Sequence, residues 1–438
     1  MNKITIIICK FASIILKLMG RGSNFPGALA LKINKNIINY FKMPKLVIAV
    51  TGSAGKGSTS SIIANVLEKD NKKVIYNKYG SNMLPGILSL LISNCSLNGK
   101  IKTDAVVMEV DERYTKVIFD ALKPKYVVIT NICRDQPPRH GNVDLVFEKI
   151  NSAITNDMTL ILNGDDPYLR KFDKCKNVIY YGINKNKYSY KINKFNNINI
   201  SYCPICNNKL KYNYYHIESL GDYYCDKCNF KRPNINYLAS IINLDKKYIV
   251  INNNKIKISF NVLYCAYNIL AAYSLLSTIK IDEKKLSNYI SNLENNNKLN
   301  EFINYKSKKI YVLNNKNENS TTFNQSVLFA SNNKEKKIII IGWKEISRRY
   351  KHNDMSWLYD IEFELLNNKY TEKIICLGRD RYDIATRMKY AGFKKNQIII
   401  LDSMKKLKNI LNNKNVKNIY AIVNFDYVEP IKRLFRED

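Results

Sequence analysis

The strongest constraint on the fold is a predicted strand, a glycine-containing turn and a predicted helix in direct succession. The apolar run 46–50 predicts a buried strand, the segment 51–59 reads Thr-Gly-Ser-Ala-Gly-Lys-Gly-Ser-Thr, and a helical pattern continues through Leu67. A turn of this kind points backbone N–H groups and the positive end of a helix dipole at a phosphate. We therefore expect a nucleoside triphosphate site, built from Gly52, Gly55, Lys56, Gly57, Ser58 and Thr59.

Short apolar runs alternate with helical patterns from residue 46 to about residue 180. This alternation predicts an α/β domain with a parallel sheet and helices on both faces. Ligands of such sheets gather at the carboxyl ends of the strands. Four polar side chains lie at or just beyond the predicted strand ends: Lys56, Glu109, Asn131 and Asn163.

A four-cysteine insertion interrupts this alternation between residues 201 and 233. Its cysteines form two CxxC pairs, Cys203 with Cys206 and Cys225 with Cys228. Four thiolates at this spacing can close a tetrahedral Zn²⁺ site. A redox pair and plain buried thiols are the competing interpretations. A closed site has no open position for substrate, so we expect structural zinc that folds the insertion and takes no part in catalysis.

Three segments follow from these patterns. Residues 1–45 form an N-terminal helical lead, residues 46–300 an ATP-binding domain that carries the insertion, and residues 301–438 a smaller C-terminal α/β domain. A helix over 261–272 and an Asn-rich linker over 291–300 precede the C-terminal domain. The strands expected from residue 46 onward are 46–50, 74–76, 105–109, 126–130, 159–162, 178–181, 248–251, 257–260, 310–313, 337–341, 373–377, 397–401 and 418–423.

The chain is strongly basic, with 70 Lys and Arg against 37 Asp and Glu and a net charge of +33. A zinc-ribbon protein that binds nucleic acid would use such a charge. The lysines, however, are scattered along the whole chain, so we expect no nucleic-acid partner. Six cysteines outside the insertion show no disulfide spacing, which favours a reducing cytoplasm.

The N-terminal stretch 4–19 is apolar but is interrupted by Lys10 and Lys17. It is also shorter than the roughly 20 apolar residues that span a bilayer. We expect an amphipathic helix that docks on the protein core or makes peripheral contact at the inner face of the cytoplasmic membrane.

Several motifs along nearly the whole chain resemble the MurT family of the Mur ligase superfamily. The two-residue gap between Gly52 and Gly55 is typical of that superfamily and of folylpolyglutamate synthases. The other matching segments are 18–27, 30–33, 109–112 (Glu-Val-Asp-Glu), 130–136, 163–167 (Asn-Gly-Asp-Asp-Pro), the four-cysteine insertion, 354–360 and 387–392.

The resemblance implies an ATP-dependent synthetase subunit that activates a carboxylate as an acyl phosphate. In that family the acceptor is the D-glutamate α-carboxylate of lipid II, a lipid-linked cell-wall precursor, and a GatD-type class I glutamine amidotransferase supplies ammonia. Ser58 and Glu109 would hold Mg²⁺, Lys56 the phosphates and Asn268 the adenine. Asp354 would complete the partner's catalytic triad, with Asp360 as the second candidate.

Each of these roles has a plainer alternative. Glu109 could be a surface carboxylate, Asn268 a polar helix residue, and Asp354 the N-cap of a helix through Leu366. The Gly57-Ser58 pair also departs from the MurT pattern and resembles folylpolyglutamate synthases. The alternative function is therefore a stand-alone amino-acid ligase that acts on another cell-wall precursor, for example a pseudomurein precursor.

Overall fold

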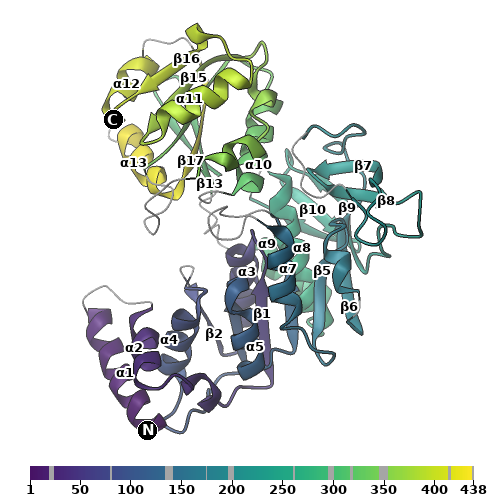
Figure 1. The fold of residues 1–438 in the computed structure, drawn as a ribbon, viewed down its shortest axis with the longest axis vertical. Helices are drawn as coiled ribbons and strands as arrows, with labels where there is room; N and C mark the ends of the chain where they lie inside the picture. The colour runs from purple at the N-terminus through teal and green to yellow at the C-terminus, as the bar shows by residue number, and fades with distance from the viewer. Residues whose placement is uncertain are drawn as a thin grey trace.

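The computed structural model describes residues 1–18, 24–78, 81–133, 142–173, 175–195, 202–259, 262–293, 300–315, 319–344, 354–412 and 416–436. The chain forms two α/β lobes, with the N-terminal helices at one end of the molecule and the C-terminal domain at the other (Figure 1). Parts of two family motifs, 19–23 and 134–136, lie outside the described residues, as does most of the predicted linker at 294–299. The domain boundary near residue 300 therefore stays a prediction.

The N-terminal lead folds as three short elements. Helix α1 spans Asn2–Leu18, α2 spans Phe25–Ile33 and the 3-10 turn η1 spans Ile37–Tyr40. Helices α1 and α2 pack against α4 (Leu84–Asn94) of the next domain. Gly27 lies directly against the backbone of α4, where a Cβ would meet the Pro85 carbonyl oxygen at 1.9 Å. The lead is thus tightly attached to the ATP-binding domain.

A nine-stranded sheet forms the centre of that domain, in the order β11-β10-β9-β6-β5-β4-β1-β3-β2. The pairs from β2 through β9 are parallel, and β9, β10 and β11 form an antiparallel edge. The strands are β1 (Leu46–Thr51), β2 (Val74–Tyr76), β3 (Ala105–Glu109), β4 (Tyr126–Ile129), β5 (Thr159–Asn163), β6 (Asn177–Ile183), β9 (Tyr237–Asn243), β10 (Tyr248–Ile251) and β11 (Asn254–Lys257).

Helices cover both faces of this sheet. Along β1, Ile48 and Val50 belong to one apolar cluster and Val47 and Ala49 to the other. Both faces of the sheet are therefore buried against apolar side chains, as is usual for a parallel sheet. The helices are α3 (Lys56–Lys69), α8 (Leu263–Thr278) and α9 (Glu283–Ser291) on the first face, with α4, α5 (Thr115–Leu122) and α7 (Val143–Asn151) on the second; η3 (Glu112–Tyr114) and η4 (Leu169–Phe172) are 3-10 turns.

The four-cysteine insertion leaves the sheet after β6 and returns to it at β9. It contains the antiparallel hairpin of β7 (Lys211–Ile217) and β8 (Leu220–Tyr224). Its own small core combines Cys203 and Cys225 with Leu210, Tyr223 and Phe230. Aromatic side chains here fill a core too small to be stable on apolar burial alone.

The C-terminal domain is a second α/β unit with a six-stranded sheet, in the order β12-β13-β17-β14-β15-β16. Only the β12–β13 edge is antiparallel. Its elements are β12 (Asn300–Tyr305), β13 (Lys308–Asn315), α10 (Ser320–Asn332), β14 (Lys337–Trp343), η5 (Ser356–Asp360), η6 (Phe363–Leu366), β15 (Thr371–Gly378), α11 (Arg381–Tyr390), η7 (Lys395–Gln397), β16 (Ile398–Leu401), α12 (Lys405–Asn412), β17 (Asn418–Asn424) and α13 (Phe425–Arg436).

The fold class expected from the sequence is confirmed, and local differences have physical causes. The strand expected at 257–260 lies earlier, at 254–257, because Asn252 and Asn253 adopt positive φ angles of 43° and 68° and close a tight hairpin. The alternative prediction of a helix from Asp354 through Leu366 is wrong, because two 3-10 turns, η5 and η6, occupy this segment. None of the helices in the described part of the chain is long and apolar enough to cross a membrane.

Candidate active site

The glycine turn after β1 is hydrogen-bonded to the two residues that follow β4, Thr130 and Asn131. Gly52 and Gly55 have φ angles of 118° and 83°, which strongly favour glycine, and α3 begins immediately afterwards at Lys56. The Asn131 side chain accepts a hydrogen bond from the Ala54 N–H at 2.9 Å, and Thr130 Oγ1 donates to the Ala54 carbonyl at 2.6 Å. These contacts fix the turn, and Gly57 at the helix start is exposed.

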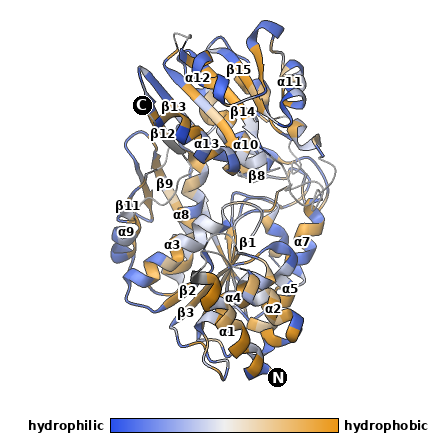
Figure 2. Cartoon of the chain, turned by 90° about the vertical axis from the view of Figure 1, so that its left-hand side faces the viewer, coloured by the Kyte–Doolittle hydropathy of each residue, from blue (hydrophilic) through white to orange (hydrophobic). Residues whose placement is uncertain are grey.

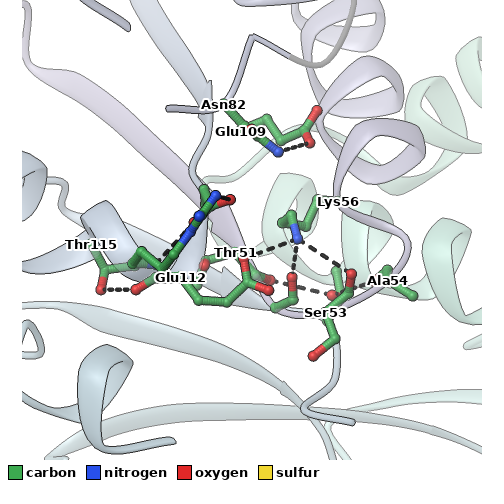
Figure 3. Close-up of polar contacts among 12 residues, drawn as sticks. Thr51, Ser53, Ala54, Lys56, Asn82, Glu109, Glu112 and Thr115 are labelled. Atoms are coloured by element: carbon green, nitrogen blue, oxygen red, sulfur yellow. Dashed lines mark hydrogen bonds and ion pairs between the residues drawn. The ribbon is translucent and has the colours of Figure 1, made fainter. Parts of the chain in front are cut away.

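Lys56 is buried and occupies the centre of the turn (Figure 3). Its ammonium group donates to the carbonyl oxygens of Gly52 and Ser53 and forms an ion pair with Glu112 at 3.2 Å. The Glu112 carboxylate is itself buried. The family motif 109–112 therefore places a counter-ion beside Lys56, the lysine predicted to bind phosphate, and the sequence reasoning did not assign this role to Glu112.

Glu109 ends β3 and is buried beside the first turn of α3. Its Oε1 accepts a hydrogen bond from the Asn82 side chain at 3.0 Å (Figure 3). A Cβ at Gly57 would lie 3.2 Å from Glu109 Oε2. The surface-carboxylate alternative is therefore wrong, because this oxygen faces the helix start and not bulk water.

The Ser58 hydroxyl, which is predicted to hold Mg²⁺, and the neighbouring Thr59 hydroxyl differ in burial. Ser58 is partly exposed at the start of α3, whereas Thr59 Oγ1 is buried and makes no hydrogen bond to another described residue. A hydroxyl and a carboxylate oxygen are the ligand types that Mg²⁺ prefers. The set Ser58, Thr59 and Glu109 thus fits a magnesium ion chemically.

Asn268 lies on α8 against the glycine turn. A Cβ at Gly55 would come within 2.4 Å of Asn268 Oδ1. Asn268 is buried and lines a pocket together with Ala54, Asn163 and Tyr264. The structure brings it together with the glycine turn, and its contact with adenine stays a prediction.

The insertion and the C-terminal domain also line this pocket, and the sequence reasoning did not predict that they would meet there. The tip of the β7–β8 hairpin contributes Glu218, and the C-terminal domain contributes Thr321, Asn324 and Asp360. Glu218 accepts hydrogen bonds from Asn324 Nδ2 at 2.8 Å and from Thr321 Oγ1 at 3.2 Å. The insertion therefore joins the two domains at the pocket.

Two neighbouring carboxylates from the 163–167 motif lie under the pocket. Asp165 is fully buried and accepts hydrogen bonds from Arg232 Nε at 2.7 Å and from the Tyr267 hydroxyl at 2.8 Å. Asp166 lines the pocket, and burial is the main cause that raises its pKa to about 7. Burial also raises the pKa of Glu218.

The two candidate triad aspartates occupy different places. Asp354 is exposed, and its Oδ1 accepts a hydrogen bond from the Ser356 N–H at 2.9 Å. Asp360 is half-buried and lines the pocket. An exposed carboxylate can reach a partner protein, whereas one in the pocket faces the ligand, so the geometry favours Asp354 for a role across an interface.

The four cysteines of the insertion converge at the base of the hairpin. Their sulfur atoms all lie within 4.8 Å of one another, with Cys203 to Cys228 at 3.6 Å and Cys206 to Cys225 at 3.4 Å. Tetrahedral Zn²⁺ with Zn–S bonds of about 2.3 Å places its sulfurs roughly 3.8 Å apart. The four thiols therefore fit a structural zinc ion.

Two family patterns match the chain: the Mur ligase middle domain over residues 50–223 and the MurT ligase C-terminal domain over residues 317–427. The MurT subunit of lipid II isoglutaminyl synthase from Staphylococcus aureus strain COL is 28% identical and aligns over 94% of this chain and 92% of its own length. The corresponding subunit from Streptococcus pneumoniae strain R6 is 27% identical over 96% and 94%. The chain belongs to the MurT family of the Mur ligase superfamily.

Solved structures support the same fold for this MurT-family chain. A pseudomurein peptide ligase type C from Methanothermus fervidus superposes with a TM-score of 0.70 at 21% identity, covering 91% of this chain and 80% of that one. The MurF ligase from Thermotoga maritima, solved with ADP, gives 0.60 at 17% identity over 93% and 83%. As a member of this family the chain is an ATP-dependent ligase.

Proposed function

We propose that this chain is the synthetase subunit of a glutamine-dependent amidotransferase that amidates the D-glutamate α-carboxylate of lipid II. The observation that carries the proposal is that the glycine turn after β1 and a MurT-type C-terminal domain line one pocket. The relatives aligned over nearly their whole length are MurT subunits of lipid II isoglutaminyl synthase. The chemistry expected of the pocket is phosphoryl transfer to a carboxylate, followed by attack of ammonia.

The turn supplies the elements that phosphoryl transfer needs. Backbone N–H groups at the start of α3 cradle the phosphates, and Lys56 exchanges the Gly52 and Ser53 carbonyls for phosphate oxygens. Glu112 pairs with the ammonium group and positions it. Mg²⁺ bound to Ser58 and Glu109 would neutralise charge on the transferring group.

The substrate carboxylate attacks the γ-phosphorus, and ADP leaves. The product is an acyl phosphate, which has a good leaving group where the carboxylate had none. Ammonia then attacks the acyl carbon and releases inorganic phosphate. Because ammonia is protonated in bulk water, its direct delivery from a docked glutaminase of the GatD type fits this chemistry, and exposed Asp354 is our candidate for the residue lent to that partner.

Reconstitution with a GatD-type glutaminase tests the proposal. The purified pair should amidate lipid II with ATP and glutamine, adding one amide for each ATP hydrolysed, as read by the mass of the precursor and by ADP release. The Asp354→Asn variant should abolish glutamine use yet retain amidation with free ammonium, whereas Asp360→Asn should not show this split. Loss of ammonium-driven amidation in Asp354→Asn would contradict the triad role.

The alternative is a stand-alone ligase that adds an amino acid to a pseudomurein-type precursor. The structural likeness to a pseudomurein peptide ligase and the Gly57-Ser58 pair favour it. Such an enzyme would couple ATP hydrolysis to an amino acid without glutamine or a partner. Amino-acid-dependent ADP release by the isolated chain, with no amidation of lipid II by the pair, would decide for this alternative.

A further inference from the structure

Helix α1 is apolar on two opposite faces. One face, with Ile6 and Cys9, is buried against the neighbouring helices α2 and α4. The opposite side chains recur every three or four residues, are 42% to 66% exposed, and are called here the apolar face of α1: Ile4, Ile7, Ile8, Phe11, Ile14 and Ile15. Packing explains the first face and leaves the second without a partner in the described chain.

Exposed apolar side chains in one continuous row are unusual on a protein surface. Figure 2 shows α1 largely in the hydrophobic colour, at the end of the molecule opposite the C-terminal domain. The apolar face is therefore remote from the pocket between the domains and is not part of the candidate active site. A large flat partner could cover it without obstructing that pocket.

The charge around the helix identifies the kind of partner. Residues 1–45 contain no Asp or Glu; the first acidic residue is Glu68. Lys3 is exposed and Lys10 is half-exposed on α1 itself. The basic residues of the lead are Lys3, Lys10, Lys17, Arg21, Lys32, Lys35, Lys42 and Lys45.

A second copy of the chain would bring two such basic surfaces together, which like-charge repulsion disfavours. An anionic lipid surface instead attracts them, with the apolar row entering the headgroup–acyl boundary. Because none of the described helices can span a bilayer, the helix would lie in the plane of the surface.

We propose that the apolar face of α1 is an interfacial membrane-binding surface that docks the enzyme on anionic phospholipid. The row of isoleucines and Phe11 supplies the apolar insertion, and the acid-free lead supplies the electrostatic attraction. The buried face of the same helix transmits this attachment to α2 and α4. Docking requires neither nucleotide nor a cell-wall substrate, so it is separable from the proposed ligase function.

Co-sedimentation of the full chain with vesicles tests this proposal. Binding should be strong to vesicles that contain phosphatidylglycerol, weaker to pure phosphatidylcholine, and reduced by salt. The double variant Ile7→Ser with Phe11→Ser should bind at least about tenfold more weakly, because two apolar side chains no longer enter the interface. Lys3→Gln and Lys10→Gln should each weaken binding about fivefold on anionic vesicles only.

The matched control is Ile241→Ser with Phe302→Ser, which removes two similarly exposed apolar side chains from strands β9 and β12. The control should bind vesicles like the unmodified chain. Thermal unfolding checks that both double variants are folded. The proposal is overturned if the unmodified chain does not bind anionic vesicles, if the α1 variant binds equally well, or if light scattering shows that the same substitutions dissociate a dimer.

Discussion

The two α/β domains contribute to the same pocket by different means. The ATP-binding domain uses backbone: its first strand ends in a turn whose Gly52 and Gly55 have positive φ angles, and a helix follows at once. The C-terminal domain uses side chains: after β13, helix α10 offers Thr321 and Asn324, and both donate to Glu218 of the insertion. The first domain thus presents a main-chain turn that the sequence predicts to bind phosphate, whereas the second domain contacts the first through side chains.

The largest test of this comparison removes the cation of the glycine turn. Lys56→Ala should lower the ATP-dependent rate roughly 10²–10³-fold, since one charged group that stabilises the transferring phosphoryl is lost. ADP release by the reconstituted pair measures the effect. Lys69→Ala, the same substitution at the end of the same helix, should leave the rate unchanged. An active Lys56→Ala enzyme would place phosphate binding elsewhere.

Loss of the metal site should break the link between the domains. Cys206→Ser removes one of four thiolate ligands, and structural zinc in small domains contributes on the order of 10 kcal/mol to folding. We expect zinc content to fall and amide hydrogen exchange in the β7–β8 hairpin to accelerate. Cys175→Ser, outside the cluster, should change neither reading. If the hairpin amides exchange equally slowly when no metal is bound, the thiols pack without an ion.

The pH dependence of stability should reveal the carboxylate under the pocket. Burial raises the pKa of Asp166 from 3.8 to about 7, so the folded state holds this proton more tightly than the unfolded chain. Its stabilising contribution is complete below pH 3.8 and is lost as the pH rises through about 7.

Asp166→Asn removes this dependence while keeping the oxygen that accepts from the Tyr168 N–H. As the pH rises from about 5 to about 8, the unfolding free energy of the variant should increase by about 2–3 kcal/mol relative to that of the unmodified chain. Denaturant titration at several pH values measures it. An equal pH dependence in both proteins would mean that Asp166 is hydrated and ionised.

The smallest expected effect comes from the contact between the insertion and the C-terminal domain. Glu218→Ala removes the acceptor of two hydrogen bonds and should cost about 1–3 kcal/mol of unfolding free energy. Glu218→Gln should retain most of it, because its oxygen can still accept from Asn324 while its amide donates to the Thr321 hydroxyl. Equal losses in both variants would show that charge, not hydrogen bonding, holds the domains together.

Sequence reasoning succeeded where the determinants are local. The glycines lie within a few residues of Lys56, and the cysteines of each CxxC pair lie within a few residues of each other, so local spacing predicts the turn and a cluster of thiols that can hold a metal. Glu218 was missed because its partner Asn324 lies 106 residues away and neither belongs to a motif. The Asn252-Asn253 turn did carry a local signal, since asparagine tolerates positive φ angles, and attention to it would have placed β11 correctly.

Strands β6 and β9 are hydrogen-bonded neighbours, with Tyr181 opposite Tyr237 and Gly182 opposite Leu238. The roughly fifty residues between them therefore leave and re-enter the sheet at adjacent points. Because β6 and β9 run parallel, any replacement for this segment must still be a crossover connection of a dozen or more residues, but its length can vary without shifting the register of the sheet. Loss of the four cysteines alone should accordingly leave the nine-stranded sheet in register.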